Sequence, residues 1–223
     1  MNQQGMFITP IRSNVAHWKV LQDQGYFENH PWYQGLVDTG GDASVTYIER
    51  FLPLQPAMNV VVIGCGYGRE TAHIAPRVRH VYGIEVSEVI LGKALAYLRE
   101  RSITNFTPAL AESYDATIPD GIDLVYSVVV MQHLTRDLVK DYLLRLGRKL
   151  SVSGRMVIQF IESTDADLTA DAEMMPYEPS VSWSLPLIAE AARHAGLKFE
   201  QAFSSLATDR AFWHWVCLGR PGT

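Results

Sequence analysis

Residues 60–70, VVVIGCGYGRE, place four apolar β-branched residues directly before three glycines that are spaced one residue apart. A short continuous apolar run is typical of a strand buried on both faces of a parallel sheet. Glycines after such a strand let backbone N–H groups approach a ligand at the carboxyl end of the sheet, where doubly wound folds bind cofactors. The stretch therefore predicts a buried first strand that leads into a binding loop.

Strand-like and helix-like segments alternate through the rest of the chain, which indicates an α/β fold with a mostly parallel, doubly wound sheet. The predicted strands are 58–64, 78–86, 105–111, 122–130 and 154–161. The predicted helices are 87–101, with Ser87 as N-cap, 135–150 and 184–196. Segments 197–206 and 211–221 are close enough in sequence to pair as antiparallel strands.

Two segments stand outside this alternation within what we expect to be a single domain, 1–223. Residues 1–50 predict a cap of short helices over an open edge of the sheet, while 51–223 form the core. The cap is rich in aromatic residues: Trp18, Tyr26, Trp32 and Tyr33. These could stack on a sugar or a planar ring, or they could simply attach the helices to the sheet. The polar segment 162–182 predicts a substrate loop, because a connection of that length is often functional.

Composition argues against several functional classes. The chain has 223 residues, 48% of them hydrophobic, and a net charge of −5, so it can bury a sizeable core but offers no basic field for nucleic acid. No apolar run approaches the roughly 20 residues that cross a bilayer, and no signal peptide is apparent, so we expect a cytoplasmic protein with no membrane partner. Cys65 and Cys217 are too few for a disulfide framework or a zinc cluster, so we expect reduced thiols and no metal.

An acidic residue completes the predicted cofactor site. Glu85 ends the second strand, where a carboxylate can accept hydrogen bonds from both hydroxyl groups of a ribose. Taken singly, the glycines could form only a tight turn, and Glu85 could be a solvated capping residue. The spacing is G-x-G-x-G, not the G-x-G-x-x-G of dinucleotide folds, and Glu70 in the next turn would repel a pyrophosphate. The pattern favours a nucleoside cofactor without phosphates.

At these residues the sequence resembles the class I S-adenosylmethionine-dependent methyltransferases. The glycine stretch is similar to the first motif of the family, and VYGIEVSEVILGKA (81–94) to the second. The fourth-strand segment, GIDLVYSVVVMQHL (121–134), and the later helix and strand segments match as well. The resemblance implies a Rossmann-like, seven-stranded sheet in the order 3-2-1-4-5-7-6 with strand 7 antiparallel. It also implies S-adenosyl-L-methionine as the cofactor.

The resemblance also assigns roles to residues. The cofactor site would comprise Gly64, Cys65, Gly66, Gly68, Glu85, Val86, Glu112 and Ser127. Glu85 would hold the ribose, Val86 would lie against the adenine, Glu112 would accept from the adenine amino group, and Ser127 would border the methyl donor. Glu112 could equally be an exposed loop acid. Val62 departs from the pattern, because the family usually has an acid there, and SVSGRM (151–156) replaces the usual turn before the fifth strand.

For the acceptor, the negative charge and the absence of the motif of amino-methylating DNA enzymes favour a small molecule, such as a saccharide or a secondary metabolite, methylated on a hydroxyl group. The alternatives are a methyltransferase of a protein or tRNA group and a non-catalytic regulatory protein that binds the cofactor. His133 is the first candidate for the general base and Glu162 the second. His133 could instead only shape the loop through a hydrogen bond to the backbone.

Overall fold

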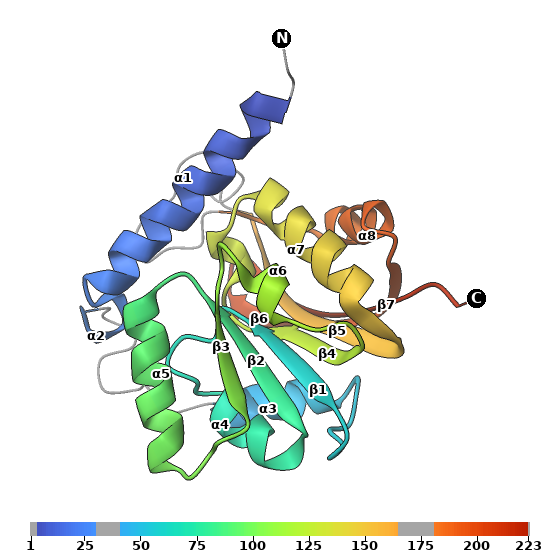
Figure 1. The fold of residues 1–223 in the computed structure, drawn as a ribbon. Coiled ribbons are helices and arrows are strands. Elements are labelled where there is room, and N and C mark those ends of the chain that lie inside the picture. Colours follow the sequence, from blue (N-terminus) through green and yellow to red (C-terminus); the bar gives the residue numbers. More distant parts are fainter. Residues whose placement is uncertain (1–3, 30–40, 165–180, 223) are drawn as a thin grey trace.

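A computed structural model describes residues 4–29, 41–164 and 181–222 (Figure 1). Its centre is a seven-stranded sheet with the order β3-β2-β1-β4-β5-β7-β6. The strands are β1 (Asn59–Ile63), β2 (His80–Glu85), β3 (Phe106–Leu110), β4 (Ile122–Ser127), β5 (Leu150–Ser163), β6 (Lys198–Thr208) and β7 (Ala211–Gly219). β7 runs antiparallel to both of its neighbours, and the other pairs are parallel. The predicted strand order and the antiparallel strand are confirmed.

Helices cover both faces of this sheet. They are α1 (Gln4–Asp23), α2 (Tyr26–Asn29), α3 (Gly41–Glu49), α4 (Thr71–Ile74), α5 (Glu88–Glu100), α6 (Tyr114–Thr117), α7 (Arg136–Lys149) and α8 (Leu185–His194), with 3-10 turns η1 (Ala75–Arg77) and η2 (Met131–His133). Alternate side chains of β1 enter opposite layers. Val60 and Val62 pack in the layer that contains α3, α4 and α5, and Val61 and Ile63 pack with α7 and α8. The continuous apolar run is therefore buried on both sides.

Two helices begin at the residues that the sequence indicates. The Ser87 hydroxyl accepts a hydrogen bond from the Ile90 N–H at 3.2 Å at the start of α5, and Thr135 caps α7 by accepting from the Leu138 N–H at 3.4 Å. Such side-chain caps satisfy N–H groups that have no partner inside the helix. Both helices run away from the carboxyl end of a strand, so their capped ends lie at one edge of the sheet.

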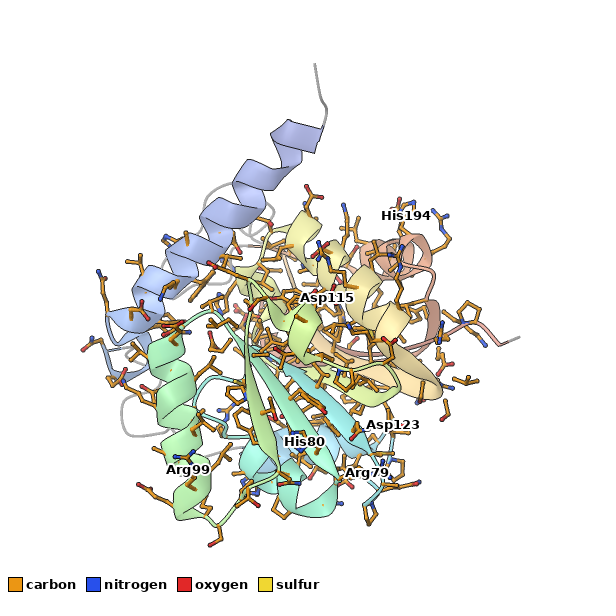
Figure 2. All side chains as sticks on the ribbon, viewed as in Figure 1. Arg79, His80, Arg99, Asp115, Asp123 and His194 are labelled. Atoms are coloured by element: carbon orange, nitrogen blue, oxygen red, sulfur yellow. The ribbon has the colours of Figure 1, made fainter. Side chains whose placement is uncertain are left out.

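The N-terminal region differs from the expectation of short helices over an open edge of the sheet. α1 is a single helix of 20 residues, and it contacts α5 and α7, which stand on opposite faces of the sheet. It lies across the carboxyl-end side of the molecule (Figure 1), while Arg79 and Asp123 lie at the opposite end of the strands (Figure 2). No helix in the described ranges is long and apolar enough to cross a membrane.

Candidate functional site

A cavity of about 130 Å³ lies at the carboxyl ends of β1, β2 and β4, with α1 as one wall. Its lining comes from α1 and α2, the glycine loop after β1, the ends of β2 and β3, the segment between β4 and α7, and α7 itself. This is the place where doubly wound sheets bind ligands, because the strand order reverses there. These segments range from residue 15 to residue 142, so the cavity forms only when the chain folds.

The glycine loop exposes its backbone to this cavity. Gly64 and Gly66 have φ values of 69° and 49°, in the left-handed region that a glycine enters without steric cost. A Cβ on Gly64 would overlap the side chain of Val130, which also lines the cavity. The N–H groups of Gly64 and Cys65 donate to the carbonyl of Ile84 at 2.9 and 3.0 Å, which fixes the loop against the end of β2.

Glu85 lies at the base of the cavity with a buried side chain, 5% exposed. Its Oε2 accepts a hydrogen bond from the Gly66 N–H at 3.1 Å, and its Oε1 accepts from the Val86 N–H at 2.7 Å. Burial raises the pKa of this carboxyl, and the hydrogen bonds from the backbone N–H groups of Val86, Gly66 and Ser87 oppose the rise. A buried carboxylate at the cavity wall can accept further hydrogen bonds from a ligand that brings hydroxyl groups.

The segment after β4 is held in an uncommon conformation. Val129 has a φ of 57°, which is rare for a β-branched residue. Its N–H donates to Oε1 of the buried Gln159 at 2.9 Å. Backbone strain of this kind is typical of functional sites. The same conformation explains why β4 ends at Ser127 although the apolar run continues to residue 130, as the predicted strand did.

His133 ends η2 on the same wall, and its half-buried side chain lines the cavity. The backbone carbonyl of His133 accepts hydrogen bonds from Trp18 Nε1 at 2.7 Å and from Asn14 Nδ2 at 3.3 Å. The rings of Trp18 and His133 lie 4.7 Å apart between centroids, and Tyr26 packs edge-on against Trp18. α1 therefore fixes the turn that carries His133.

The C-terminal end of α1 and the following α2 are attached to the start of α5 and to the glycine loop. The Ser87 hydroxyl donates to Oδ1 of Asp23 at 2.5 Å. Beyond α1, Glu28 of α2 forms an ion pair with Lys93 of α5 and accepts a hydrogen bond from the Tyr67 hydroxyl in the glycine loop. These contacts hold the helix across the mouth of the sheet.

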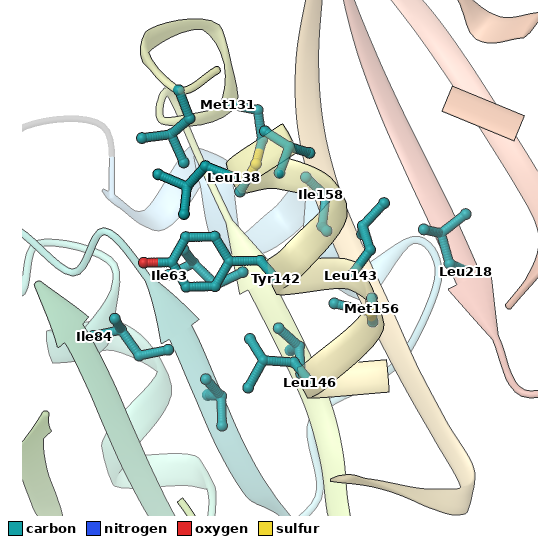
Figure 3. Packing of buried hydrophobic residues seen from close by; sticks show 14 of the residues in the cluster. Ile63, Ile84, Met131, Leu138, Tyr142, Leu143, Leu146, Met156, Ile158 and Leu218 are labelled. Atoms are coloured by element: carbon teal, nitrogen blue, oxygen red, sulfur yellow. The ribbon is translucent and has the colours of Figure 1, made fainter. Parts of the chain in front are cut away.

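The remaining wall is largely apolar. Tyr142 of α7 lies over Ile63 at the end of β1, and Leu138 lies beside it (Figure 3). Burial raises the pKa of the Tyr142 hydroxyl, so this group stays protonated and neutral. Arg69 and Glu70, which follow the glycine loop, are by contrast charged. Arg69 Nε donates to Glu70 Oε1 at 2.9 Å. The lining of the cavity thus combines charged and apolar side chains.

Comparison with known proteins places this arrangement in a family. Residues 60–154 match a protein family that is described as "Methyltransferase domain". A TehB-like S-adenosylmethionine-dependent methyltransferase from Corynebacterium glutamicum is 20% identical, with a TM-score of 0.58 over 94% of this chain and 97% of its own. Magnesium protoporphyrin IX methyltransferase from Synechocystis, solved with bound S-adenosylmethionine, is 15% identical, with a TM-score of 0.68 over 93% and 97%.

Phosphoethanolamine N-methyltransferase 2 from Haemonchus contortus, also solved with S-adenosylmethionine, is 15% identical, with a TM-score of 0.68 over 92% of this chain and 60% of its own. No curated protein matches the sequence. The chain carries a class I S-adenosylmethionine-dependent methyltransferase domain. The predicted family and cofactor are therefore confirmed.

The hydrogen-bonding groups that line the cavity of this methyltransferase suit S-adenosylmethionine. The buried Glu85 carboxyl offers acceptor oxygens at the base of the cavity, and Gly64, Cys65, Gly66 and Val86 line the cavity beside it. A ribose carries the hydroxyl donors that such a carboxylate needs. Among the predicted cofactor residues, these five come together around one space.

Three other predicted cofactor residues lie off the cavity. Gly68 has a φ of 87°, and a Cβ there would contact Leu98 of α5 at 3.4 Å, so it packs the loop against a helix. Ser127 is fully buried, and its hydroxyl donates to the Ile63 carbonyl at 2.9 Å, which joins β4 to β1. Glu112 is exposed beyond β3, whereas its neighbour Ala111 lines the cavity. Their predicted roles toward the cofactor remain predictions.

The two catalytic candidates of the methyltransferase are not brought together. His133 lines the cavity, but Glu162 on β5 accepts a hydrogen bond from His214 Nε2 at 2.7 Å and does not line it. The Nδ1 of His214 is in turn 2.7 Å from the Ser204 hydroxyl on β6. Glu162 thus belongs to a polar row across β5, β7 and β6.

Parts of the predicted acceptor-binding segments lie outside the described residues: His30, Trp32 and Tyr33, and most of the loop 162–182. The described end of that loop reaches the turn of His133. Val181 N–H donates to the Gln132 carbonyl at 3.1 Å, and Arg136 donates to the Ser182 carbonyl at 3.0 Å. Within the described ranges, no group of three or more His, Cys, Asp or Glu residues could hold a metal ion.

Gln22 was missed by the sequence reasoning. It lines the cavity from α1, on the same helical face as Val15 and Trp18. The spacing of 3 and 4 residues between these positions is the available signal, since it places them on one stripe of a helix. Only the aromatic members of the stripe stand out in the sequence, because glutamine is common on exposed helix surfaces.

Proposed function

We propose that this methyltransferase methylates a hydroxyl group of a small, uncharged molecule, such as a saccharide or a secondary metabolite. The observation that carries the proposal is the position of His133. Its half-buried imidazole lines the same cavity as Glu85 and the glycine loop, and lies beside apolar side chains. A base at that place serves an acceptor whose proton must be removed, as with a hydroxyl group.

The polar residues of the cavity would hold the cofactor. The Glu85 carboxylate, which lines the cavity, would accept hydrogen bonds from the ribose hydroxyl groups, and the backbone of Gly64, Cys65 and Gly66 would leave room for the nucleoside. When bound, S-adenosylmethionine supplies an electrophilic methyl group on a sulfonium sulfur, which leaves as a neutral thioether. The protein contributes position and proton removal.

The apolar side chains of the lining argue against a charged acceptor. They include Val15, Trp18, Leu134 and Leu138. Among the described lining residues, Arg69 is the one cation, and its guanidinium already binds Glu70. A phosphate or carboxylate on the acceptor would lose its hydration here without gaining an opposite charge of its own, which is costly.

His133 is the residue to which we assign the acceptor proton. The hydrogen bond from Trp18 Nε1 to its carbonyl fixes the turn, while the imidazole remains at the cavity wall. A neutral imidazole nitrogen can accept the hydroxyl proton as the oxygen takes the methyl group. Fixing the backbone of the base is a form of positioning, which accounts for a large part of enzymatic rate enhancement.

A turnover screen tests the proposal. The protein is incubated with S-adenosylmethionine and, separately, with neutral hydroxylated small molecules, their phosphorylated counterparts, tRNA and protein, and S-adenosylhomocysteine and methylated products are measured by mass spectrometry. We expect product with neutral hydroxylated compounds and little with the phosphorylated forms. Product with tRNA or protein alone would contradict the proposal. Donor binding without turnover on any class would instead support a regulatory protein.

A further inference from the structure

Gln22 combines burial with an unsatisfied polar atom at the cavity wall. Its side chain is 7% exposed, it lines the cavity, and its Oε1 has no hydrogen-bond partner within the described ranges. Buried side-chain oxygens in native proteins are nearly always hydrogen-bonded, so an exception calls for an explanation. A ligand in the cavity that brings an N–H or O–H group would supply the missing donor.

The contacts of α1 place Gln22 toward the end of β2, where Glu85 lies. Asp23, the next residue, accepts a hydrogen bond from the Ser87 hydroxyl at 2.5 Å, and Ser87 follows Glu85 by two positions. One helical turn earlier, Trp18 donates to the carbonyl of His133 in the turn before α7. Along the helix, Gln22 therefore lies on the side of Glu85.

We propose that the Gln22 amide oxygen accepts a hydrogen bond from the nucleoside of the bound donor, from a ribose hydroxyl or the adenine amino group. The inference rests on the assignment of this cavity to S-adenosylmethionine made under the proposed function. The exposed position of Glu112, the residue first expected to receive the adenine amino group, leaves that role open for a residue of the cavity wall. Gln22 would thus make α1 part of the donor site.

The proposal predicts that substitution of Gln22 weakens ligand binding without lowering the stability of the ligand-free protein. A packing role would predict a loss of stability. An unpartnered buried amide oxygen destabilises the ligand-free protein, so its replacement by an apolar side chain of similar length should not lower stability. The same replacement removes an interaction of the complex. We therefore expect Gln22→Met to leave the ligand-free melting temperature unchanged or higher and to weaken nucleoside binding roughly 3- to 10-fold.

The experiment is calorimetry with S-adenosylhomocysteine and with methylthioadenosine, which keeps the nucleoside but lacks the amino-acid end. Wild type, Gln22→Met and Gln22→Leu are compared, and Gln24→Leu, at an exposed position just after α1, is the control. We expect both Gln22 variants to lose affinity for both ligands by a similar factor. The control should bind as wild type does.

Other outcomes would overturn the inference. Unchanged affinity in both Gln22 variants would remove Gln22 from the site, and a loss with S-adenosylhomocysteine alone would move the contact away from the nucleoside. A lower ligand-free melting temperature in both variants would make the residue structural. Failure of the wild type to bind either ligand would contradict the donor site itself, which separates that failure from the failure of Gln22.

Discussion

The Glu85 carboxylate and the Gly66 N–H, 19 positions apart in sequence, form a hydrogen bond of 3.1 Å that joins the two segments predicted to bind the cofactor. The carboxylate therefore holds the glycine loop against the end of β2. Because Oε1 is engaged by the Val86 N–H as well, both carboxyl oxygens are held in place. A group fixed in this way does not need to be ordered when the cofactor enters, which reduces the entropic cost of binding.

The first prediction concerns this carboxylate. Glu85→Ala should weaken binding of S-adenosylhomocysteine by about 1.5–3 kcal/mol, because hydrogen bonds to a charged group are lost. Titration calorimetry measures the change, and Glu88→Ala, an exposed residue at the start of α5, is the control. Equal affinity of Glu85→Ala and wild type would contradict the ribose assignment.

The second prediction concerns pH. Burial raises the pKa of Glu85 in the ligand-free protein, whereas ribose hydroxyl groups donate to the charged form, so binding should release a proton. Affinity for S-adenosylhomocysteine should fall as the pH is lowered through the raised pKa, and Glu85→Gln should flatten the profile.

The stability of the ligand-free protein should depend on pH in the opposite direction. A raised folded pKa gives a contribution that is present below the unfolded pKa and lost as the pH rises through the folded pKa. Thermal unfolding of wild type and Glu85→Gln, measured as the pH rises through the pKa of Glu85, tests this loss of stability independently of binding. A wild-type binding profile as flat as that of Glu85→Gln would show that Glu85 does not titrate in the binding equilibrium.

The third prediction concerns the glycine loop. Gly66→Val should abolish binding of S-adenosylhomocysteine, since a branched side chain would occupy the space next to the exposed backbone. The φ of 49° should also make the variant less stable by about 1–3 kcal/mol, with the fold retained. Gly92→Ala, on an exposed helical position with open space around it, is the control and should gain about 1 kcal/mol. Normal binding by Gly66→Val would mean that the glycines form only a tight turn and do not contact the cofactor.

The fourth prediction concerns proton removal. If His133 is the base, His133→Ala should lower kcat by ~10²–10⁴-fold while donor affinity changes little. The hydrogen bond from Trp18 ends on the backbone carbonyl of residue 133, so it survives the substitution. His194→Ala, at the end of the distant α8 (Figure 2), is the control. A smaller loss, or weakened donor binding instead, would make His133 structural and direct the search to Glu162 and His17.

The fifth prediction concerns the attachment of α1. Ser87→Ala removes both the N-cap of α5 and the hydrogen bond to Asp23, whereas Thr135→Ala removes only the N-cap of α7. We expect a loss of about 1 kcal/mol in unfolding free energy for Thr135→Ala and about 1–2 kcal/mol for Ser87→Ala. Hydrogen exchange should show faster exchange of α1 in Ser87→Ala only. Equal exchange of α1 in the two variants would mean that Asp23 does not anchor the helix.

Local patterns explain what the sequence could predict. The run 60–70, the position of Glu85 and the cap residue Ser87 each carry a signal within a few residues, because strand, loop and helix geometry fix how such residues lie. The strand order followed from resemblance to a family in which that pattern is specific.

What escaped prediction depends on contacts between distant segments. The hydrogen bond from Trp18 to the carbonyl of His133 joins residues 115 positions apart, and Glu162 meets His214 only because β5 and β7 run side by side. The end of β4 was misplaced because Val128 to Val130 have high strand propensity, and the tertiary contact with Gln159 overrides it. No local pattern records such pairings.

Helix α1 has a consequence for how specificity can evolve in this protein. It precedes the span that matches the methyltransferase domain family, and it meets the core through side chains such as Trp18 and Asp23, without adding a strand to the sheet. A change on its inner face therefore alters one wall of the cavity and leaves the sheet and its glycine loop intact. Substitutions in this single helix could therefore change which acceptor the protein binds while the fold is kept.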